Sequence, residues 1–198
     1  MAGPVMGDDG VSRCWWAAGD PLLRAYHDHE WGRPQRDDDP FFELLTREAF
    51  QAGLSWTTIL RKRDGFRRAF AQFRIEVIAG FDEHDVARLL TDASIVRHRG
   101  KIEATVANAR AAAALDQSLA ELVWTYAPAA RRRPHDATEI PAQTAESAAL
   151  AKELRLRGFR FLGPTTGYAF MQAAGLVDDH VDGCVVPLTD AEHEPITS

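Results

Sequence analysis

The chain has 198 residues, of which 45% are hydrophobic and 26% are charged, as in an average soluble globular protein. No apolar stretch approaches the ~18 residues of a membrane-spanning helix, and the first ten residues lack the basic start and apolar run of a signal peptide. The two cysteines cannot build a disulfide scaffold, so we expect a cytoplasmic protein with no membrane partner.

The net charge of −6 is unevenly distributed along the chain. Residues 1–40 carry −4 and residues 176–198 carry −6, which leaves the segment 41–175 at +4. Twenty of the 23 basic residues are arginine, whose forked guanidinium group suits phosphate contacts. A high arginine content can equally reflect genome composition. The charge pattern therefore permits a polyanionic partner without requiring one.

Helix signals recur along the chain, whereas strand signals are nearly absent. Residues that favour helix N-caps precede several apolar-periodic segments: Asp39 before Pro40, Ser55, Asp64, and Asp82 or Asp85. Helix ends are indicated by Pro128, Gly158 and Gly175. The sequence thus predicts an all-α fold of about eight or nine short helices, at 40–54, 56–63, 65–73, 86–92, 100–116, 119–127, 146–157 and 164–174. Residues 127–144 are the one extended loop.

Two cysteines and two histidines near the ends of the chain form a candidate metal site: Cys14, His27, His180 and Cys184. Thiolate and imidazole are the ligands that tetrahedral zinc prefers. Single cysteines and histidines more often serve packing, which is the alternative for such wide spacing. Four protein ligands would leave no open position, so a zinc here would be structural and would join the two termini.

A basic turn at 94–101, SIVRHRGK, separates two predicted helices. Glycine at the start of the second helix can bring backbone N–H groups close to a phosphate, and the neighbouring cations add charge. The residues concerned are Arg97, Arg99, Gly100 and Lys101. The alternative is an ordinary basic loop between helices.

Glu48 falls on the apolar stripe of the helix predicted at 40–54. A carboxylate on such a stripe costs free energy unless it is paired or faces a cavity. The common alternatives are a salt bridge, a capping role or a place at the edge of the stripe. Four aromatic residues accompany it in the sequence, Trp16, Tyr26, Trp31 and Trp56. Such side chains are ordinarily core, but they also stack on flipped or cationic bases.

Several long segments, above all AYHDHEWG, QAGLSW and RHRGKI, resemble the 3-methyladenine DNA glycosylase I family. The likeness covers roughly residues 12–186. It implies one all-α helix-hairpin-helix domain in two lobes over 12–186, with flexible segments at 1–11 and 187–198. It also implies a hairpin at 94–101 and a structural zinc on Cys14, His27, His180 and Cys184.

The resemblance further implies a base pocket in which Glu48 reads the base, and acts as the catalytic carboxylate, among the four aromatic residues. The implied reaction is hydrolysis of the N-glycosidic bond of 3-methyladenine in double-stranded alkylated DNA, which releases the free base and leaves an abasic site. We expect a monomer. This chain has Leu23 where the family often has tyrosine, which removes one aromatic contact. Asp116 lies where relatives of the hairpin fold place an aspartate, but the resemblance gives it no catalytic role.

Two other hypotheses are compatible with parts of the sequence. A non-enzymatic module that binds DNA or senses alkylation damage would bind the base without releasing it. A metal hydrolase built on His27, His29 and Glu30 would need an open zinc position, against which the remote His180 and Cys184 argue.

Overall fold

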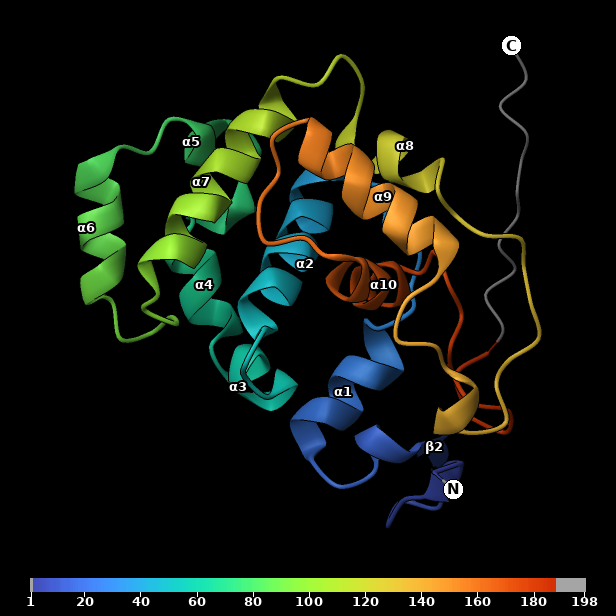
Figure 1. Cartoon of the computed structure of the whole chain (residues 1–198). Helices are drawn as coiled ribbons and strands as arrows, with labels where there is room; N and C mark the ends of the chain where they lie inside the picture. Colours follow the sequence, from blue (N-terminus) through green and yellow to red (C-terminus); the bar gives the residue numbers. More distant parts are fainter. Residues whose placement is uncertain (1, 188–198) are drawn as a thin grey trace.

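The structure, a computed structural model, describes residues 2–187 and is mostly helical, as predicted (Figure 1). No helix among these residues is both long enough and apolar enough to span a bilayer. The helices are α1 (Pro21–His29), α2 (Asp38–Gln51), α3 (Trp56–Arg61), α4 (Arg63–Ala69), α5 (Ile75–Ala79), α6 (Glu83–Thr91), α7 (Arg99–Ala113), α8 (Leu119–Trp124), α9 (Ala145–Leu156) and α10 (Pro164–Ala173).

Helix α2 runs through the middle of the molecule and packs against α3, α5, α7, α8 and α10. Figure 1 shows α5, α6 and α7 on one side of it and α8, α9 and α10 on the other. Phenylalanines on and around α2, among them Phe41, Phe50, Phe66 and Phe70, are fully buried and form one continuous apolar core. Because α2 is surrounded on several sides, any polar side chain on it must find a partner or a cavity.

Most of the predicted helix boundaries are close to those observed. The side chain of Ser55 caps α3, and Asp82 forms a capping box with Asp85 at α6. Gly158 and Gly175 follow α9 and α10 with φ of 96° and 78°, a backbone conformation that glycine adopts without steric cost.

The predicted cap at Asp39 is wrong, because α2 begins two residues earlier than predicted, at Asp38, and Asp37 is its N-cap. Asp39 instead accepts a hydrogen bond from the backbone N–H of Ile75. Its neighbour Asp38 accepts from the backbone N–H groups of Leu119 and Ala120 at the start of α8. These carboxylates therefore join α2 to distant elements. Asp64 lies within the first turn of α4 and provides no side-chain cap.

Two strands and two α-helices were not predicted: the strands β1 (Pro4–Met6) and β2 (Ser12–Cys14) and the helices α1 and α5. The strands pair antiparallel, with Val5 opposite Arg13, and β1 lies within the predicted extension 1–11. A strand of three residues is too short to show an alternating pattern. The predicted tail beyond residue 187 lies outside the described residues.

Candidate functional site

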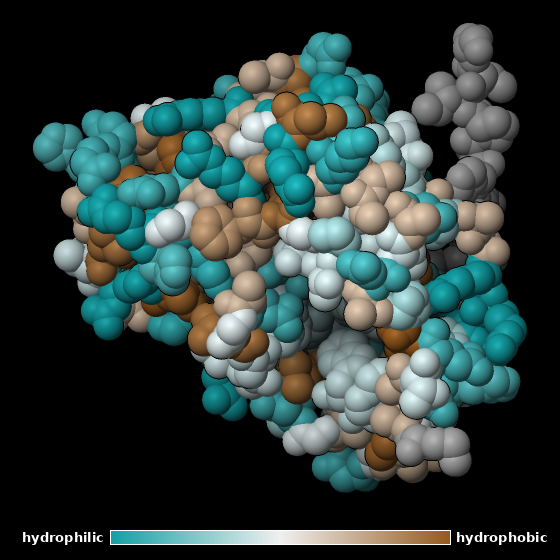
Figure 2. All heavy atoms as spheres, in the orientation of Figure 1, coloured by the Kyte–Doolittle hydropathy of each residue, from teal (hydrophilic) through white to brown (hydrophobic). Residues whose placement is uncertain are grey.

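A cavity of about 250 Å³ opens where α1, α2, α3 and α10 meet. In Figure 2 the surface is hollowed in the lower centre, near the place where Figure 1 shows α1, α2 and α10 coming together. Every residue predicted for the base pocket contributes to its lining, which consists of Trp16, Leu23, Tyr26, Trp31, Glu48, Gln51, Trp56, Thr57, Ala169 and Gln172. The cavity is smaller than pockets for drug-sized ligands, which suits a single base.

Aromatic rings form two walls of this pocket. The rings of Tyr26 and Trp56 have centroids 5.3 Å apart, and those of Trp16 and Trp31 meet edge to face at 5.0 Å. Tyr26 Oη and Trp56 Nε1 are buried and have no hydrogen-bond partner within the described chain. Because buried polar groups are nearly always paired, these two atoms are available to a ligand or to water.

Glu48 projects from α2 into the same cavity, and only 6% of the residue is exposed. Over residues 2–187 its carboxylate neither forms an ion pair nor caps a helix, so the structure argues against the salt bridge and the capping role considered above. Burial raises the pKa of Glu48 to about 8, while the positive charge of Arg47 acts in the opposite direction. An apolar pocket that holds one unpaired carboxyl group favours a ligand that brings a positive charge or a hydrogen-bond donor.

Sequence reasoning did not single out two polar residues of the lining, Gln51 and Gln172. Gln51 follows Glu48 by three residues, a spacing that places both on one face of α2, so it could have been found. Gln172 comes from α10 and reaches the pocket only through tertiary packing. Leu23, the departure from the family pattern, also lines the pocket.

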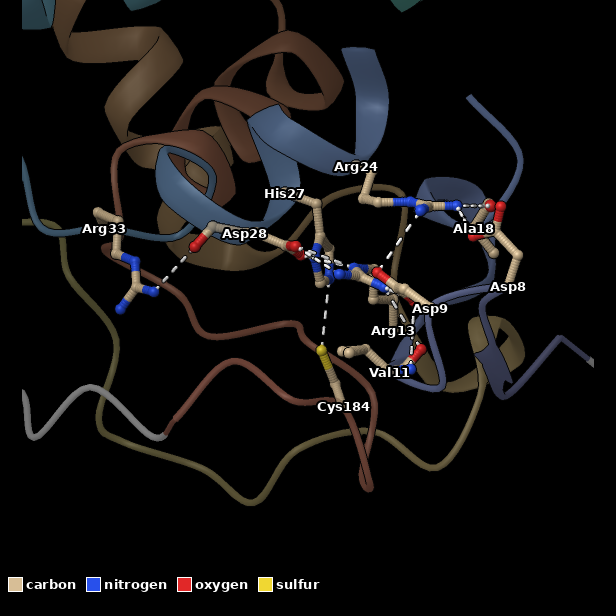
Figure 3. Close-up of polar contacts among 10 residues, drawn as sticks. All are labelled: Asp8, Asp9, Val11, Arg13, Ala18, Arg24, His27, Asp28, Arg33 and Cys184. Atoms are coloured by element: carbon tan, nitrogen blue, oxygen red, sulfur yellow. Dashed lines mark hydrogen bonds and ion pairs between the residues drawn. The ribbon is translucent and has the colours of Figure 1, made fainter. Parts of the chain in front are cut away.

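The predicted metal ligands converge from the two ends of the chain. The ligand atoms of Cys14, His27 and Cys184 all lie within 4.8 Å of one another, and His27 Nε2 is 3.3 Å from Cys184 Sγ (Figure 3). The fourth predicted ligand, His180, has its ring 5.1 Å from that of His27. His180 Nε2 is buried and lacks a hydrogen-bond partner in the described part of the chain, as expected of an atom reserved for a ligand.

A carboxylate is hydrogen-bonded to Nδ1 of each imidazole ring, the nitrogen on the other side of the ring from Nε2. His27 Nδ1 lies 2.8 Å from Asp28 and His180 Nδ1 lies 2.8 Å from Asp178. Arg13 pairs with Asp28 (Figure 3), and Arg133 pairs with Asp178. Carboxylates in this position fix the ring orientation of metal-binding histidines and leave Nε2 free.

The surrounding backbone and the two thiols also fit a metal. Gly32 has φ 76°, and a Cβ there would lie 2.7 Å from the His180 ring, so only glycine allows this approach. The hydrogen bond between the two sulfurs, together with burial, raises the pKa of Cys14, whereas the same bond and the contact with His27 lower the pKa of Cys184, which favours a thiolate at Cys184. By contrast, Glu30, named for the metal-hydrolase hypothesis, pairs with Arg63.

The basic turn connects α6 to α7 and presents two arginines at the surface. Arg97 and Arg99 are exposed, and Arg99 pairs with Glu83 and Glu103. Gly100 lies in the first turn of α7. Asp116 is exposed, pairs with Arg157 and is not among the residues lining the pocket.

Lys101 is oriented inward, contrary to the prediction that it contacts DNA. Only 7% of the residue is exposed, and its ammonium group donates to the backbone oxygens of Phe50 and Ala52 at 2.8 and 2.7 Å. Burial lowers its pKa. Lys101 therefore fixes the end of α2 to α7 instead of reaching a phosphate.

A mostly helical fold whose central helix presents a buried carboxyl group to an aromatic-walled pocket defines a helical protein with a site for a small aromatic or cationic ligand. Comparison with known proteins identifies the family. Residues 16–187 match the model of the methyladenine glycosylase family, and the chain belongs to that family.

Individual relatives agree in sequence and in structure. DNA-3-methyladenine glycosylase 1 of Escherichia coli (strain K12) is 47% identical over 88% of this chain and 96% of its own length. DNA-3-methyladenine glycosylase of Haemophilus influenzae is 41% identical over 88% and 97%. A solved structure of 3-methyladenine DNA glycosylase I from Staphylococcus aureus, which concerns the structural basis of 3-methyladenine recognition, superposes with TM-score 0.84 at 37% identity, covering 88% of this chain and 96% of that one.

Proposed function

We propose that this protein is a DNA repair glycosylase that hydrolyses the N-glycosidic bond of 3-methyladenine in double-stranded alkylated DNA. Water adds to the sugar carbon, the bond to the base breaks, and the products are free 3-methyladenine and an abasic site. The observation that carries the proposal is the unpaired carboxyl of Glu48 in an aromatic-walled cavity of single-base size. The names of the relatives in E. coli and H. influenzae support it.

Methylation at N3 makes the base cationic while it is attached to DNA, which already makes it a good leaving group. The enzyme has to unstack the nucleotide, hold the cation and exclude neutral adenine. The electron-rich faces of Trp16, Tyr26, Trp31 and Trp56 favour a cation over a neutral base, and the carboxylate of Glu48 does the same. We assign Glu48 as the catalytic residue because it contacts the base whose bond breaks.

We propose that the turn between α6 and α7 is the hairpin of a helix-hairpin-helix element. We also propose that this turn contacts DNA. Arg97 and Arg99 are exposed there, and the backbone at Gly100 lies in the first turn of α7, where N–H groups face an approaching phosphate. Such contacts bind the DNA backbone without reading the sequence.

A structural zinc is proposed on Cys14, His27, His180 and Cys184. The two thiols, the Nε2 atom of His27 beside Cys184, the unpartnered Nε2 atom of His180 and the carboxylates behind the rings fit tetrahedral zinc. Bound zinc would cross-link the two ends of the domain and would take no part in the reaction at the base. With the ends joined, residues 12–186 form one domain in two lobes. We place the protein in the cytoplasm as a monomer, where its thiols stay reduced.

The direct test is to incubate the purified protein with methylated DNA and to chromatograph the bases released. A glycosylase releases 3-methyladenine with time. The alternative, a damage-sensing module, binds the DNA and the free base but releases nothing, and that result would refute the proposed activity.

A further inference from the structure

Gln172 on α10 lines the proposed base pocket. Its side-chain amide is hydrogen-bonded to a residue outside the pocket lining. Gln172 Nε2 donates to Asp179 Oδ2 at 2.8 Å. Asp179 is almost fully buried and also accepts from Tyr168 Oη at 2.6 Å. Arg131 completes the network with an ion pair to Asp179 and a hydrogen bond to Tyr168 Oη.

The chemistry of Asp179 fixes which way the amide points. Carboxylate oxygens accept hydrogen bonds, and both oxygens of Asp179 face donors: Oδ1 pairs with Arg131 and Oδ2 accepts from Tyr168 Oη. The amide nitrogen of Gln172 must therefore face Asp179, and its oxygen faces the other way. Among residues 2–187 no donor is hydrogen-bonded to Gln172 Oε1, so an acceptor is left available in the pocket.

We infer that Gln172, positioned by Asp179, is a specificity-determining residue that accepts a hydrogen bond from the exocyclic amine of the bound base. This inference rests on the proposed function. The amine is the hydrogen-bond donor of 3-methyladenine, and Glu48 on α2 is a second acceptor on another wall of the same cavity. A base that carries a carbonyl oxygen at position 6 would place two acceptors against each other, which costs free energy in a buried site.

The test compares the equilibrium affinities of purified protein for free 3-methyladenine and 3-methylhypoxanthine, which differ in amine and carbonyl at position 6. In Gln172→Met the acceptor is lost at nearly constant size. In Asp179→Asn the new amide can donate, which frees Gln172 to turn its nitrogen toward the pocket. We expect each substitution to lower the ratio of the two affinities roughly tenfold. A general loosening of the pocket would weaken both bases and leave the ratio unchanged.

Two controls make the test decisive. Gln117→Met, at an exposed position, should leave the ratio at the wild-type value. In the double variant Gln172→Met/Asp179→Asn the ratio should be no lower than in Gln172→Met, because Asp179 acts through Gln172.

The inference is overturned if folded Gln172→Met has the wild-type ratio of the two affinities. It is also overturned if Asp179→Asn lowers this ratio in the double variant as much as it does in the wild-type protein. If Asp179→Asn does not fold, Gln172→Met alone decides. Failure of the wild-type protein to bind 3-methyladenine would instead refute the proposed function, so the two failures are distinguishable.

Discussion

At the scale of single residues, the role of Glu48 depends on its charge. Glu48→Gln keeps the size of the side chain but replaces the carboxyl, which can ionise and accept a hydrogen bond from the base amine on either oxygen, with a neutral amide that has a single acceptor oxygen. We expect it to weaken binding of free 3-methyladenine by about 1–3 kcal/mol, and Glu48→Ala to weaken it more. Titration calorimetry on variants whose circular dichroism matches wild type measures the effect. Wild-type affinity in folded Glu48→Ala would make the carboxyl structural.

Burial of Glu48 also predicts how stability depends on pH. Its pKa is about 8 in the folded protein against an ordinary value of 4.5, so between these values the folded state binds a proton that the unfolded state does not. The free energy of unfolding should therefore fall as the pH rises from about 5 to 8, by up to about 1.4 kcal/mol per pH unit. Glu48→Gln should lack this component. Urea unfolding of both proteins across this range tests it, and parallel curves would contradict it.

Within this pocket, the sequence could predict which residues form the lining better than it could predict which side chains they contact. Glu48 stood out because a carboxylate interrupted an apolar stripe, and the aromatic residues because they cluster in the chain. Gln172 carries no local signal. Its pocket position and its bond to Asp179 depend on how α10 packs against the segment that follows it.

At the scale of elements, the turn between α6 and α7 is expected to bind the DNA backbone. Arg97→Ala should weaken binding equally for different DNA sequences and reduce the salt dependence by roughly one phosphate contact. Arg155→Ala, an exposed arginine on α9, is the matched control. Fluorescence anisotropy over a range of salt concentrations measures both slopes, and identical slopes would exclude the turn from the interface.

Lys101 acts between elements, at the junction of α2 and α7. Lys101→Met keeps the aliphatic stem but leaves the carbonyls of Phe50 and Ala52 without their donor. We expect it to lower the free energy of unfolding by about 1–3 kcal/mol. Lys152→Met, at an exposed position on α9, should have little effect. Equal stability of the two variants would contradict this role.

The basic turn shows why helices were easier to predict than contacts. Charge and glycine spacing correctly placed a connection between two helices, but nothing in RHRGK distinguishes the exposed arginines from the buried lysine. That distinction arises from the end of α2, fifty residues earlier in the chain, where free carbonyls accept the ammonium group. Strand β1 was missed for a related reason, because the strand that pairs with it within residues 2–187 also has only three residues.

At the scale of the whole molecule, the proposed zinc site joins the chain ends and supports the pocket. The ring of His180 packs edge to face on Trp31 at 4.6 Å, and that of His27 on Trp16 at 5.1 Å. Both tryptophans line the cavity. Loss of the metal should therefore lower stability and base affinity together.

The measurement is metal content by mass spectrometry beside thermal unfolding. We expect about one zinc per chain in the wild-type protein, and a loss of both zinc and thermal stability in Cys14→Ser and His180→Ala. His84→Ala, an exposed histidine on α6, is the matched control. Purified wild-type protein that holds no zinc and melts at the same temperature with and without a chelator would contradict the proposed site.

One pocket is proposed both to select the methylated base and to allow its release from the DNA. Single-turnover excision from methylated DNA, compared between the wild-type protein and Glu48→Gln at saturating enzyme, tests this most directly. We expect the wild-type protein to release 3-methyladenine while unmethylated adenine stays in the DNA, and Glu48→Gln to release it at least tenfold more slowly. Equal release rates for the two proteins, or no release by either, would contradict the account.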